Sequence, residues 1–385
     1  MITLVSSRQN LKETNRIVVK VGTSSLTYDS GRLNLKCLDL LVREIANLHN
    51  AGKEVLLVSS GAVGAGIGRL GLKERPNTIP ERQAVAAVGQ GLLMQMYTKL
   101  FAEYGINTAQ ILLTREDMSD RKRYLNVRNT LTMLANKYRV LPIINENDTV
   151  ATDELLLRFG DNDTLAALVA SSVGADLLIL LSDIEGLYSS DPRENKDAYL
   201  ISEVKEITPE IMATAGKPGT ARGTGGMQTK LEAARIATSA GICMVLASGD
   251  EPHILSQIID GEAIGTIFIP RPEALAQRER WIAFGGQPLG AVIIDQGAVT
   301  ALVEYKKSLL PSGIIDVIGD FGVGDLVWIL DAEKNRIARG LSNFSSEEIS
   351  KIKGHNTAQL PQIVGHKTFD EVVHRNNMVC LDGSG

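Results

Sequence analysis

The stretch RIVVKVGTSS, residues 16–25, joins a short apolar run to a glycine turn and carries one charge in its interior, Lys20. The apolar run predicts a buried strand over Arg16–Val21. Desolvating an unpaired ammonium group is costly, so a lysine at this place needs an explanation. One reading is a strand-end lysine in solvent. The glycine and hydroxyls that follow favour the other, a lysine that reaches the crevice where α/β sheets bind ligands.

Around this stretch, residues 16–265 alternate strand-like and helix-like segments, which predicts crossover connections and a mainly parallel sheet. The run 177–181 is five apolar residues long and suits a strand covered on both faces. A long helix is expected to begin near Pro80 and to end before Gly105. Other expected strands are 54–58, 108–113, 140–144 and 243–247, and other expected helices cover 38–48, 127–137, the residues after 163, and 227–240.

The pattern changes after about residue 271, where a charged, proline-flanked stretch resembles a connector. Short β-like runs follow at 291–294, 326–330 and 336–340, with dense turn signals and one short helix near 346–353. The sequence therefore predicts an α/β chain with a larger domain at 14–270, a linker at 271–288 and a small β-rich domain at 289–375.

Composition excludes several classes of protein. The net charge of −5 gives no general attraction to nucleic acid or anionic lipid. Three cysteines without paired spacing argue against a disulfide framework and a structural zinc site. No apolar run reaches the roughly 18 residues that a membrane span needs, so a cytoplasmic protein without a membrane span is expected.

A second cation of interest is Lys230, at the end of GTGGMQTK, residues 223–230. Its glycines allow close backbone approach, and the helix that begins there adds positive potential to the ammonium charge, so an anion site is favoured over a flexible capping loop. The Walker A pattern GxxxxGK[ST] is absent, as are the HRD and DFG elements of protein kinases.

Two clusters of acids and amides lie between the lysines: NEND at 145–148 follows a strand, and GDND at 160–163 precedes a helix. An Asx turn and a helix cap are the structural alternatives for them. Beyond those roles, Asp163 could hold both lysines through charge-assisted hydrogen bonds or approach a magnesium ion through water. Short acids and amides also suit the ammonium and carboxylate groups of an amino acid.

Three further segments come after expected strands. Ser60 and Gly61 can turn backbone N–H groups toward an anion. The GxGxxG match at 66–71 begins well after its strand, so glycines at a helix junction or under a substrate are expected there rather than a dinucleotide fingerprint. Ser182 and Asp183 close another strand and could hold a nucleotide, although a strand and hairpin would look similar.

Taken together, these motifs resemble the glutamate 5-kinases (γ-glutamyl kinases) of the amino-acid kinase superfamily, over roughly residues 14–375. The C-terminal segment is similar to a PUA domain through residues 308–314 and the turn region 319–325. The resemblance implies an amino-acid-kinase-like sandwich with a mainly parallel central sheet and a small PUA-like domain. It also implies the reaction of ATP with L-glutamate to give ADP and L-glutamyl 5-phosphate, which opens proline biosynthesis.

The resemblance further implies the role of each residue. Lys20 and Lys230 would contact the transferring phosphoryl group, and Asp163 would orient them. No protein ligand is assigned to the implied Mg²⁺, and the implied partners are proline as feedback inhibitor, glutamyl phosphate reductase and further copies of the chain. Glutamate would be bound by Ser60, Gly61, Asp148 and Asn162, and ATP by Lys20, Ser182, Asp183, Thr224, Gly225, Gly226, Met227, Gln228, Thr229 and Lys230.

Two alternatives remain open on the sequence. A kinase of the same superfamily could act on N-acetylglutamate, aspartate or UMP, although an N-acetylated substrate has no ammonium group for the acids near Asp148. The PUA-like segment could bind RNA. Residues 285–385 hold nine Lys and Arg against twelve Asp and Glu, a net negative charge that a phosphate backbone would repel, so RNA is not expected as a partner.

Overall fold

The computed structural model describes residues 7–28, 30–151, 162–193, 195–214, 226–270, 277–360, 363 and 369–381. The chain forms two compact units. The larger comprises Met1–Met118 and Lys122–Leu275, and the smaller comprises Ser119–Arg121 and Ala276–Gly385. Each unit has its own sheet and its own buried apolar core.

The larger unit is built on an eight-stranded sheet with the order β3-β4-β2-β1-β5-β7-β8-β6. Neighbouring strands are parallel except β7 and β8, so the predicted mainly parallel sheet is confirmed. The chain adds β2 on one side of β1 and later β5 on the other, which makes β1 the switch point where ligands bind in such sheets. The strands are β1 (Arg16–Val21), β2 (Glu54–Ser59), β3 (Thr108–Leu113), β4 (Leu141–Glu146), β5 (Leu177–Ser182), β6 (Glu203–Val204), β7 (Cys243–Ser248) and β8 (Thr266–Phe268).

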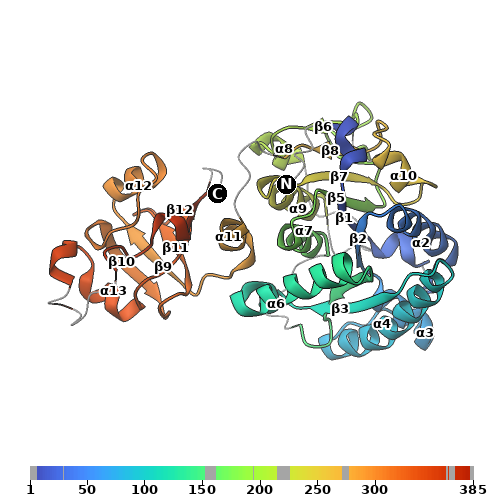
Figure 1. Ribbon diagram of the computed structural model, residues 1–385, viewed down its shortest axis with the longest axis horizontal. Coiled ribbons are helices and arrows are strands. Elements are labelled where there is room, and N and C mark those ends of the chain that lie inside the picture. The colour runs from blue at the N-terminus through green and yellow to red at the C-terminus, as the bar shows by residue number, and fades with distance from the viewer. Residues whose placement is uncertain are drawn as a thin grey trace. The chain divides into compact units, whose positions relative to one another are not determined.

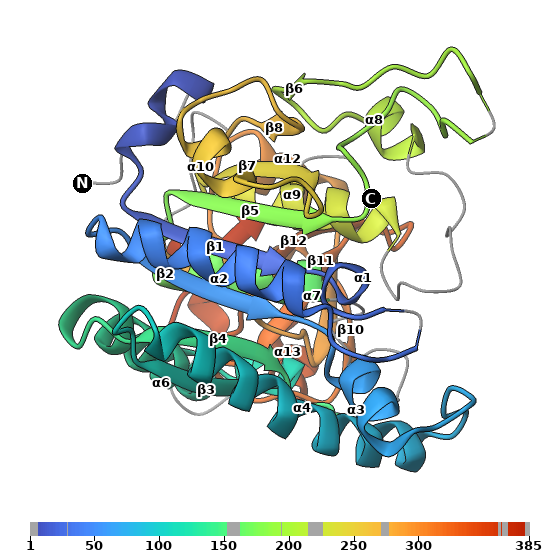
Figure 2. The same cartoon turned by 90° about the vertical axis from the view of Figure 1, so that its right-hand side faces the viewer.

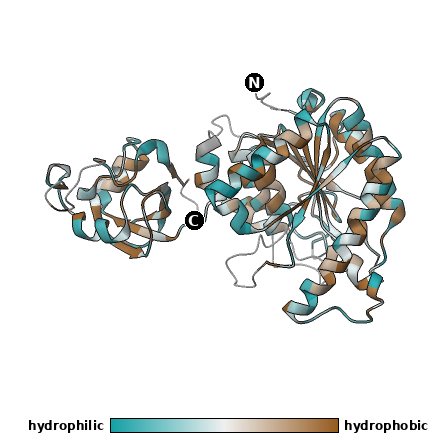
Figure 3. Cartoon of the chain, turned by 60° about the horizontal axis from the view of Figure 1, so that its bottom comes forward, coloured by the Kyte–Doolittle hydropathy of each residue, from teal (hydrophilic) through white to brown (hydrophobic). Residues whose placement is uncertain are grey.

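Helices cover both faces of this sheet, with α2, α4 and α10 on one side and α7 and α9 on the other (Figure 1, Figure 2). Every residue of β2 and β5 is buried, as expected for strands covered on both faces, and the strands are correspondingly brown in Figure 3. Among the described residues, no helix combines the length and the apolar character that crossing a membrane needs. The helical segments between residues 8 and 259 are η1 (Arg8–Glu13), α1 (Thr23–Leu26), α2 (Leu35–Asn50), α3 (Ala62–Leu70), α4 (Ile79–Ala102), α5 (Arg115–Ser119), α6 (Arg121–Thr132), η2 (Met133–Lys137), α7 (Asn162–Val173), α8 (Pro209–Thr214), α9 (Met227–Ser239) and α10 (Ile254–Ile259).

The long helix α4 has clear stop and start signals. The Thr78 hydroxyl accepts a hydrogen bond from the Glu81 N–H, and the Glu81 carboxylate accepts one from the Thr78 N–H, with Pro80 in the first turn. At the other end, Gly105 adopts the left-handed conformation with φ 71°, which favours glycine after a helix. Both ends therefore agree with the sequence prediction to within a few residues.

The glycines of the GxGxxG match lie in α3 and serve a close helix crossing. A Cβ atom placed on Gly66 would lie 2.0 Å from the carbonyl oxygen of Val85 in α4. One placed on Gly89 of α4 would lie 1.8 Å from the carbonyl oxygen of Ala62. Only residues without a side chain allow the two backbones to touch in this way. The expected helix junction is confirmed, and it fixes α4 beside the turn that follows β2.

The smaller unit holds a five-stranded sheet with the order β10-β9-β11-β12-β13, in which only β9 and β11 pair in parallel. Its buried core includes Val292, Val327, Ile329 and Leu302. Within the stretch assigned from sequence to a linker, 277–285 is helical. The elements of this unit are α11 (Gln277–Arg280), η3 (Trp281–Gly285), β9 (Gly290–Ile294), α12 (Gln296–Val303), η4 (Pro311–Gly313), β10 (Ile314–Gly319), β11 (Leu326–Leu330), β12 (Arg336–Leu341), α13 (Ser346–Ile352), η5 (Thr357–Gln359), η6 (Arg375–Asn377) and β13 (Met378–Cys380).

Among the elements of the smaller unit without a counterpart in the sequence predictions are the strands β10 and β13 and the helix α12. β10 is an edge strand whose residues are mostly exposed, so it lacks an apolar run. α12 begins at the Asp295 cap but contains Gly297 and three β-branched residues, which weaken a helical signal. β13 is only three residues long. Their positions are set by packing rather than by local preference.

Candidate active site

Three charged side chains meet inside the larger unit, although they come from distant parts of the chain. Lys20 lies in β1, Asp163 in the first turn of α7, and Lys230 in the first turn of α9. All three are buried, with 4%, 0% and 6% of their surfaces exposed. Lys20 Nζ lies 2.5 Å from Asp163 Oδ1, and Lys230 Nζ lies 3.1 Å from Asp163 Oδ2. One carboxylate therefore holds both ammonium groups, one on each oxygen.

The alternation of side chains along β1 explains why Lys20 faces this cluster. Ile17, Val19 and Val21 pack into the apolar core on the side of the sheet covered by α2. Because successive side chains of a strand point to opposite faces, Lys20 points to the side covered by α7 and α9. Asp163 and Lys230 lie in the first turns of those two helices. Strand alternation and helix starts together bring the three charges to one point.

A threonine adds a further donor to the shared carboxylate. The Thr229 hydroxyl shares its single hydrogen between Asp163 Oδ2 at 3.3 Å and the Gly226 carbonyl oxygen at 2.9 Å. Asp163 also lies where a helix start favours negative charge. Two ammonium groups and one carboxylate leave these three side chains with one net positive charge, fixed in a site screened from water. Such preorganised charge stabilises a negative charge that develops during a reaction.

Polar side chains next to the charge cluster form a hydrogen-bonded group. Asn162 directly precedes Asp163, and its Nδ2 donates to Ser60 Oγ at 2.8 Å and to Asn145 Oδ1 at 2.9 Å. Ser60 is buried and follows β2. Gly61, with φ 101°, directly precedes α3. The structure thus brings Ser60, Gly61 and Asn162 together beside the lysines.

Asp148 lies in the turn after β4 and is half-buried. The N–H groups of Val150 and Ala151 donate to the Asn147 carbonyl, and the Thr149 hydroxyl donates to Asn147 Oδ1 at 2.6 Å. The NEND cluster therefore divides its roles, because the second asparagine closes an Asx-type turn while the first belongs to the polar group around Asn162. Gly160 and Asp161 of the second cluster lie outside the described residues.

Of the residues expected to bind a nucleotide, those that the structure describes lie in β1, at the end of β5 and at the start of α9. Ser182 is buried and its Oγ donates to Asp183 Oδ1 at 3.0 Å, while Asp183 is exposed. Gly226 precedes α9 and has no side chain with which to cap the first-turn N–H groups. Met227, Gln228 and Thr229 form that first turn together with Lys230. Thr224 and Gly225 lie outside the described residues.

Two side chains of α4, Gln90 and Tyr97, also reach this region, and no sequence pattern singles out either. Asn145 Nδ2 donates to Gln90 Oε1 at 2.9 Å. The hydroxyls of Tyr97 and Ser59 are 2.9 Å apart, and burial raises the pKa of Tyr97. In sequence, Gln90 is an ordinary polar residue of a long helix and Tyr97 continues its apolar face, so neither carries a signal of function.

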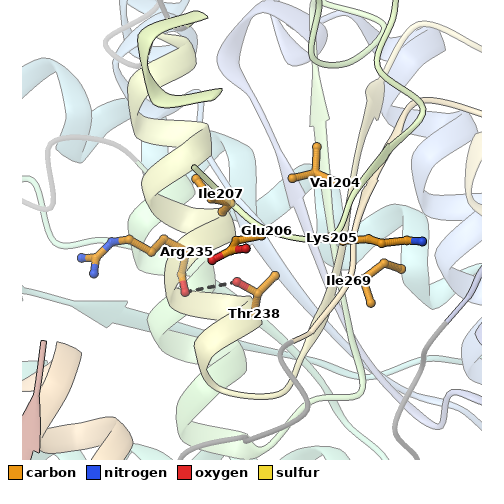
Figure 4. Close-up of a pocket in the computed structure, with 7 residues that line it drawn as sticks. All are labelled: Val204, Lys205, Glu206, Ile207, Arg235, Thr238 and Ile269. Carbon is orange, nitrogen blue, oxygen red and sulfur yellow. Dashed lines mark hydrogen bonds between the residues drawn. The ribbon is translucent and has the colours of Figure 1, made fainter. Parts of the chain in front are cut away.

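A small hollow between the segment after β6 and helix α9 lies away from these residues (Figure 4). It measures about 10 Å³, which is room for about one water molecule, and none of the predicted site residues lines it. Within the described ranges, no group of three or more His, Cys, Asp or Glu side chains is arranged to hold a metal ion. The hollow is lined by Val204, Lys205, Glu206, Ile207, Arg235, Thr238 and Ile269.

Comparison with known proteins agrees with both units. Residues 15–248 match the amino acid kinase family, and residues 290–364 match the PUA domain. These matches confirm the predicted fold class, a sandwich of the amino-acid-kinase type with a small PUA domain after it. Among solved structures, a carbamate kinase from Giardia lamblia bound to AMP-PNP aligns over 68% of this chain and all of its own length, at 19% identity and a TM-score of 0.48.

Curated relatives are more similar to this chain in sequence than the solved structure is. Glutamate 5-kinase from Thermoanaerobacter sp. (strain X514) is 55% identical over 95% of this chain and 98% of its own length. Glutamate 5-kinase from Moorella thermoacetica is 52% identical over 97% of this chain and 98% of its own. The one from Nostoc sp. (strain PCC 7120) is 49% identical over 95% and 97%. At this identity and coverage, the chain belongs to the glutamate 5-kinase family within the amino acid kinases.

Proposed function

We infer that the chain phosphorylates the side-chain carboxylate of L-glutamate with ATP, giving L-glutamyl 5-phosphate, the first step of proline biosynthesis. We further propose that Lys20 and Lys230 contact the phosphoryl group during transfer. The observation that carries this assignment is the convergence of both ammonium groups on Asp163 at 2.5 and 3.1 Å. Negative charge is spread over the oxygens of a phosphoryl group in transfer, and two fixed cations can stabilise it.

The chemistry needs positive charge more than it needs a base. The attacking group is a carboxylate with an ordinary pKa of about 4.3, so it is ionised near neutral pH. The barrier arises from bringing this anion to a polyanion. A net positive cluster in a site screened from water lowers that barrier, and Asp163 keeps the two ammonium groups in place between turnovers.

Glutamate is proposed to bind at the carboxyl ends of β2 and β4. Ser60 and Asn162 supply a hydroxyl and an amide that are in contact at 2.8 Å. Gly61 adds the backbone at the start of α3, and Asp148 adds a carboxylate that attracts the substrate ammonium. The distance between these groups and the lysines would set which length of amino acid places its side-chain carboxylate at the phosphoryl group.

ATP is proposed to lie across the ends of β5 and α9. Ser182 is the last residue of β5 and Asp183 follows it, while Gly226 precedes α9 and Lys230 lies in its first turn. The N–H groups of a helix start and a glycine-rich approach suit phosphate oxygens. Lys20 and Lys230 are thereby shared between nucleotide binding and phosphoryl transfer.

Magnesium is proposed to enter with the nucleotide. The Asp163 carboxylate is already bound to two lysines. Mg²⁺ commonly keeps several waters and binds mainly through substrate phosphates. Its contribution when bound is to neutralise phosphate charge, while the protein residues described above orient the two substrates.

Other properties are proposed on family membership. Proline would inhibit at or overlapping the glutamate site, and glutamyl phosphate reductase would consume the product. The chain would form homo-oligomers in the cytoplasm, and the PUA domain would serve interaction or regulation rather than RNA binding. We propose domain limits of 14–270 for the catalytic domain and 289–375 for the PUA domain, with 271–288 between them.

Replacing Lys230 tests the assignment. Lys230→Ala is expected to lower kcat by roughly a hundredfold to a thousandfold, because one of two cations at the transferring group is lost. Asp163 keeps Lys20 as a partner, so the circular dichroism spectrum should be unchanged. Glutamate-dependent ADP formation is the measurement. Lys99→Ala is the control, because Lys99 is an exposed lysine on α4.

Normal turnover in a folded Lys230→Ala protein would refute the role of that lysine. A panel of glutamate, N-acetylglutamate, aspartate and UMP, each with ATP, tests the substrate. If N-acetylglutamate, aspartate or UMP gave a higher kcat/KM than glutamate, that compound would be the proposed substrate instead.

A further inference from the structure

We propose that Gln90 is a positioning residue that sets which atom of Asn162 faces the substrate, and that it thereby controls the affinity for the free amino group of glutamate. The proposal rests on the proposed binding of glutamate at Ser60 and Asn162. It assigns a role to a residue of α4 that lies outside the motifs of the site.

Three hydrogen bonds connect Gln90 with Ser60 through two asparagines. Asn145 Nδ2 donates to Gln90 Oε1 at 2.9 Å. Asn162 Nδ2 donates to Asn145 Oδ1 at 2.9 Å and to Ser60 Oγ at 2.8 Å. These residues come from α4, β4, the start of α7 and the turn after β2. Each amide has one donor end and one acceptor end, so the orientation of one fixes the next.

Asn145 is held at both of its ends. It is buried, with 3% of its surface exposed, and its Oδ1 also accepts the backbone N–H of Glu146 at 2.9 Å. A backbone N–H can only donate, so it requires the oxygen of Asn145 at that end. Gln90 Oε1 then satisfies the amide nitrogen at the opposite end. Without that acceptor, the Asn145 amide nitrogen would be an unpaired buried donor, which costs about 1–3 kcal/mol and favours a shift of Asn145 away from the position in which its oxygen accepts from Asn162.

The position of Gln90 itself is fixed by its neighbour in α4. Gly89 packs so closely on α3 that a Cβ atom there would lie 1.8 Å from the Ala62 carbonyl oxygen. This crossing holds α4 against the turn that contains Ser60 and Gly61. The Gln90 side chain therefore starts from a rigid point, as a positioning residue requires.

The orientation of Asn145 determines which hydrogen-bonding groups of Asn162 and Ser60 stay available. Asn162 Nδ2 has two hydrogens, and its two hydrogen bonds use both. Asn162 Oδ1 is buried and accepts no hydrogen bond from any described residue. Because Ser60 Oγ accepts from Asn162, its own O–H can donate elsewhere.

The site therefore offers one acceptor, Asn162 Oδ1, and one donor, the Ser60 hydroxyl. That pair is complementary to an α-ammonium group and its neighbouring carboxylate. A rotated Asn162 would instead turn N–H groups toward the ammonium, which places donors against a donor. Gln90 thus acts through Asn145. It affects how strongly the site prefers an amino acid over an analogue that lacks the amino group.

The test compares substitutions at Gln90 with a Gln-to-Met substitution at a nearby position of the same helix. Gln90→Met keeps the length of the side chain and removes the acceptor, whereas Gln90→Glu keeps oxygens at the same place. Gln95→Met is the matched control, because Gln95 is exposed on the same helix. Gln90→Leu serves as a second variant without an acceptor in case Gln90→Met does not fold.

In glutamate-dependent ADP formation, Gln90→Met is expected to raise KM for glutamate roughly tenfold, the equivalent of one unpaired buried donor. KM for ATP and kcat of Gln90→Met should stay within about twofold of those of the unmodified protein. For Gln95→Met and Gln90→Glu, kcat and both KM values should stay within the same range. The preference for glutamate over glutarate, which lacks the amino group, should fall by a similar factor in Gln90→Met. A role in packing alone would not change that preference.

Unchanged KM for glutamate in the folded variants without an acceptor would overturn the inference. An equal loss in Gln90→Glu would also overturn it, because the acceptor is retained there. No glutamate-dependent turnover in the unmodified protein would overturn the proposed function instead, so the two failures are distinguishable.

Discussion

Asp163 is the residue on which the charges of the site depend. It is fully buried and binds one lysine with each carboxylate oxygen. Burying charges is favourable only when each is paired, and removing one partner typically costs about 3–5 kcal/mol. Asp163 therefore stabilises the two ammonium groups where they are needed, and their net positive charge remains available to an anion.

Asp163→Asn should reduce turnover far more than it weakens either substrate. The amide has the same size but only one acceptor oxygen, and its nitrogen would face an ammonium group. We expect kcat to fall at least a hundredfold, with KM for ATP and for glutamate changing much less. Steady-state kinetics with each substrate varied in turn is the measurement. A variant with kcat near that of the parent protein would show that the lysines are positioned without this carboxylate.

At the scale of elements, α4 does more than cover the sheet. It crosses α3 at backbone contact through Gly66 and Gly89, and it carries Gln90 and Tyr97 to the ends of β4 and β2. The position of one helix thus affects polar contacts next to the proposed glutamate site. A change at the crossing should disturb both stability and substrate affinity.

Gly89→Ala tests this crossing. The added methyl group would lie 1.8 Å from the Ala62 carbonyl oxygen, so the helices must separate. We expect the free energy of unfolding to fall by about 1–3 kcal/mol, as for overpacking in a core, and KM for glutamate to rise. Gly91→Ala, two residues along the same helix with open space around it, should instead stabilise by about 0.5–1 kcal/mol. Equal effects of the two substitutions in urea denaturation would contradict the crossing argument.

A second element, η1, is attached to the sheet edge through one arginine. The Arg8 guanidinium donates to the carbonyl oxygens of Ser202, Glu262, Ile264 and Gly265. Its planar fork of donors matches several acceptors at once, which a lysine cannot do. The segment before β1 is therefore joined to the region of β6 and β8.

Arg8→Met should lower the free energy of unfolding by about 2 kcal/mol, because four carbonyl oxygens lose a charged donor. Lys12→Met is the control from the same segment, since Lys12 makes an exposed ion pair with Asp260 at 3.3 Å. Its effect should stay below about 1 kcal/mol. Thermal unfolding midpoints of the two variants give the comparison, and a larger effect for Lys12→Met would contradict this role of Arg8.

At the scale of the whole molecule, His49 contributes to the dependence of stability on pH. Its Nε2 donates to the Arg139 carbonyl, and burial, followed by the positive charge of Arg139, lowers the pKa of His49. In the unfolded chain the pKa of His49 returns to about 6.5. Near and below that pH, the unfolded state therefore binds more protons than the folded state. Stability contributed by neutral His49 is therefore present above about pH 6.5 and is lost as pH falls below it.

His49→Gln keeps an N–H donor for the Arg139 carbonyl and removes the titration. We expect its free energy of unfolding to fall less between about pH 7.5 and about pH 5.5 than that of the parent protein. Urea denaturation at each pH measures the two slopes. Identical slopes would show that His49 is equally protonated in both states.

The sequence carries enough to predict the larger unit and the charge cluster, for a physical reason. Strands such as β5 are continuous apolar runs, and a lysine in a buried strand needs a partner, so both leave strong local signals. Gln90 leaves none, because its role depends on a crossing with α3 that no local pattern reveals. The strand β10 is similar, because its place at an edge follows from pairing with β9 and not from its own residues.

The geometry around Asp163 has a consequence for how the protein is made. Lys20 is synthesised early and Lys230 late. When the ribosome has completed β5, the chain contains Asp163 and Lys20 but not Lys230, so Asp163 has only one of its two lysine partners. Enzymatic competence should therefore appear only once translation has passed α9 and that helix has docked. The onset of activity in a synchronised translation reaction would then time the completion of this domain.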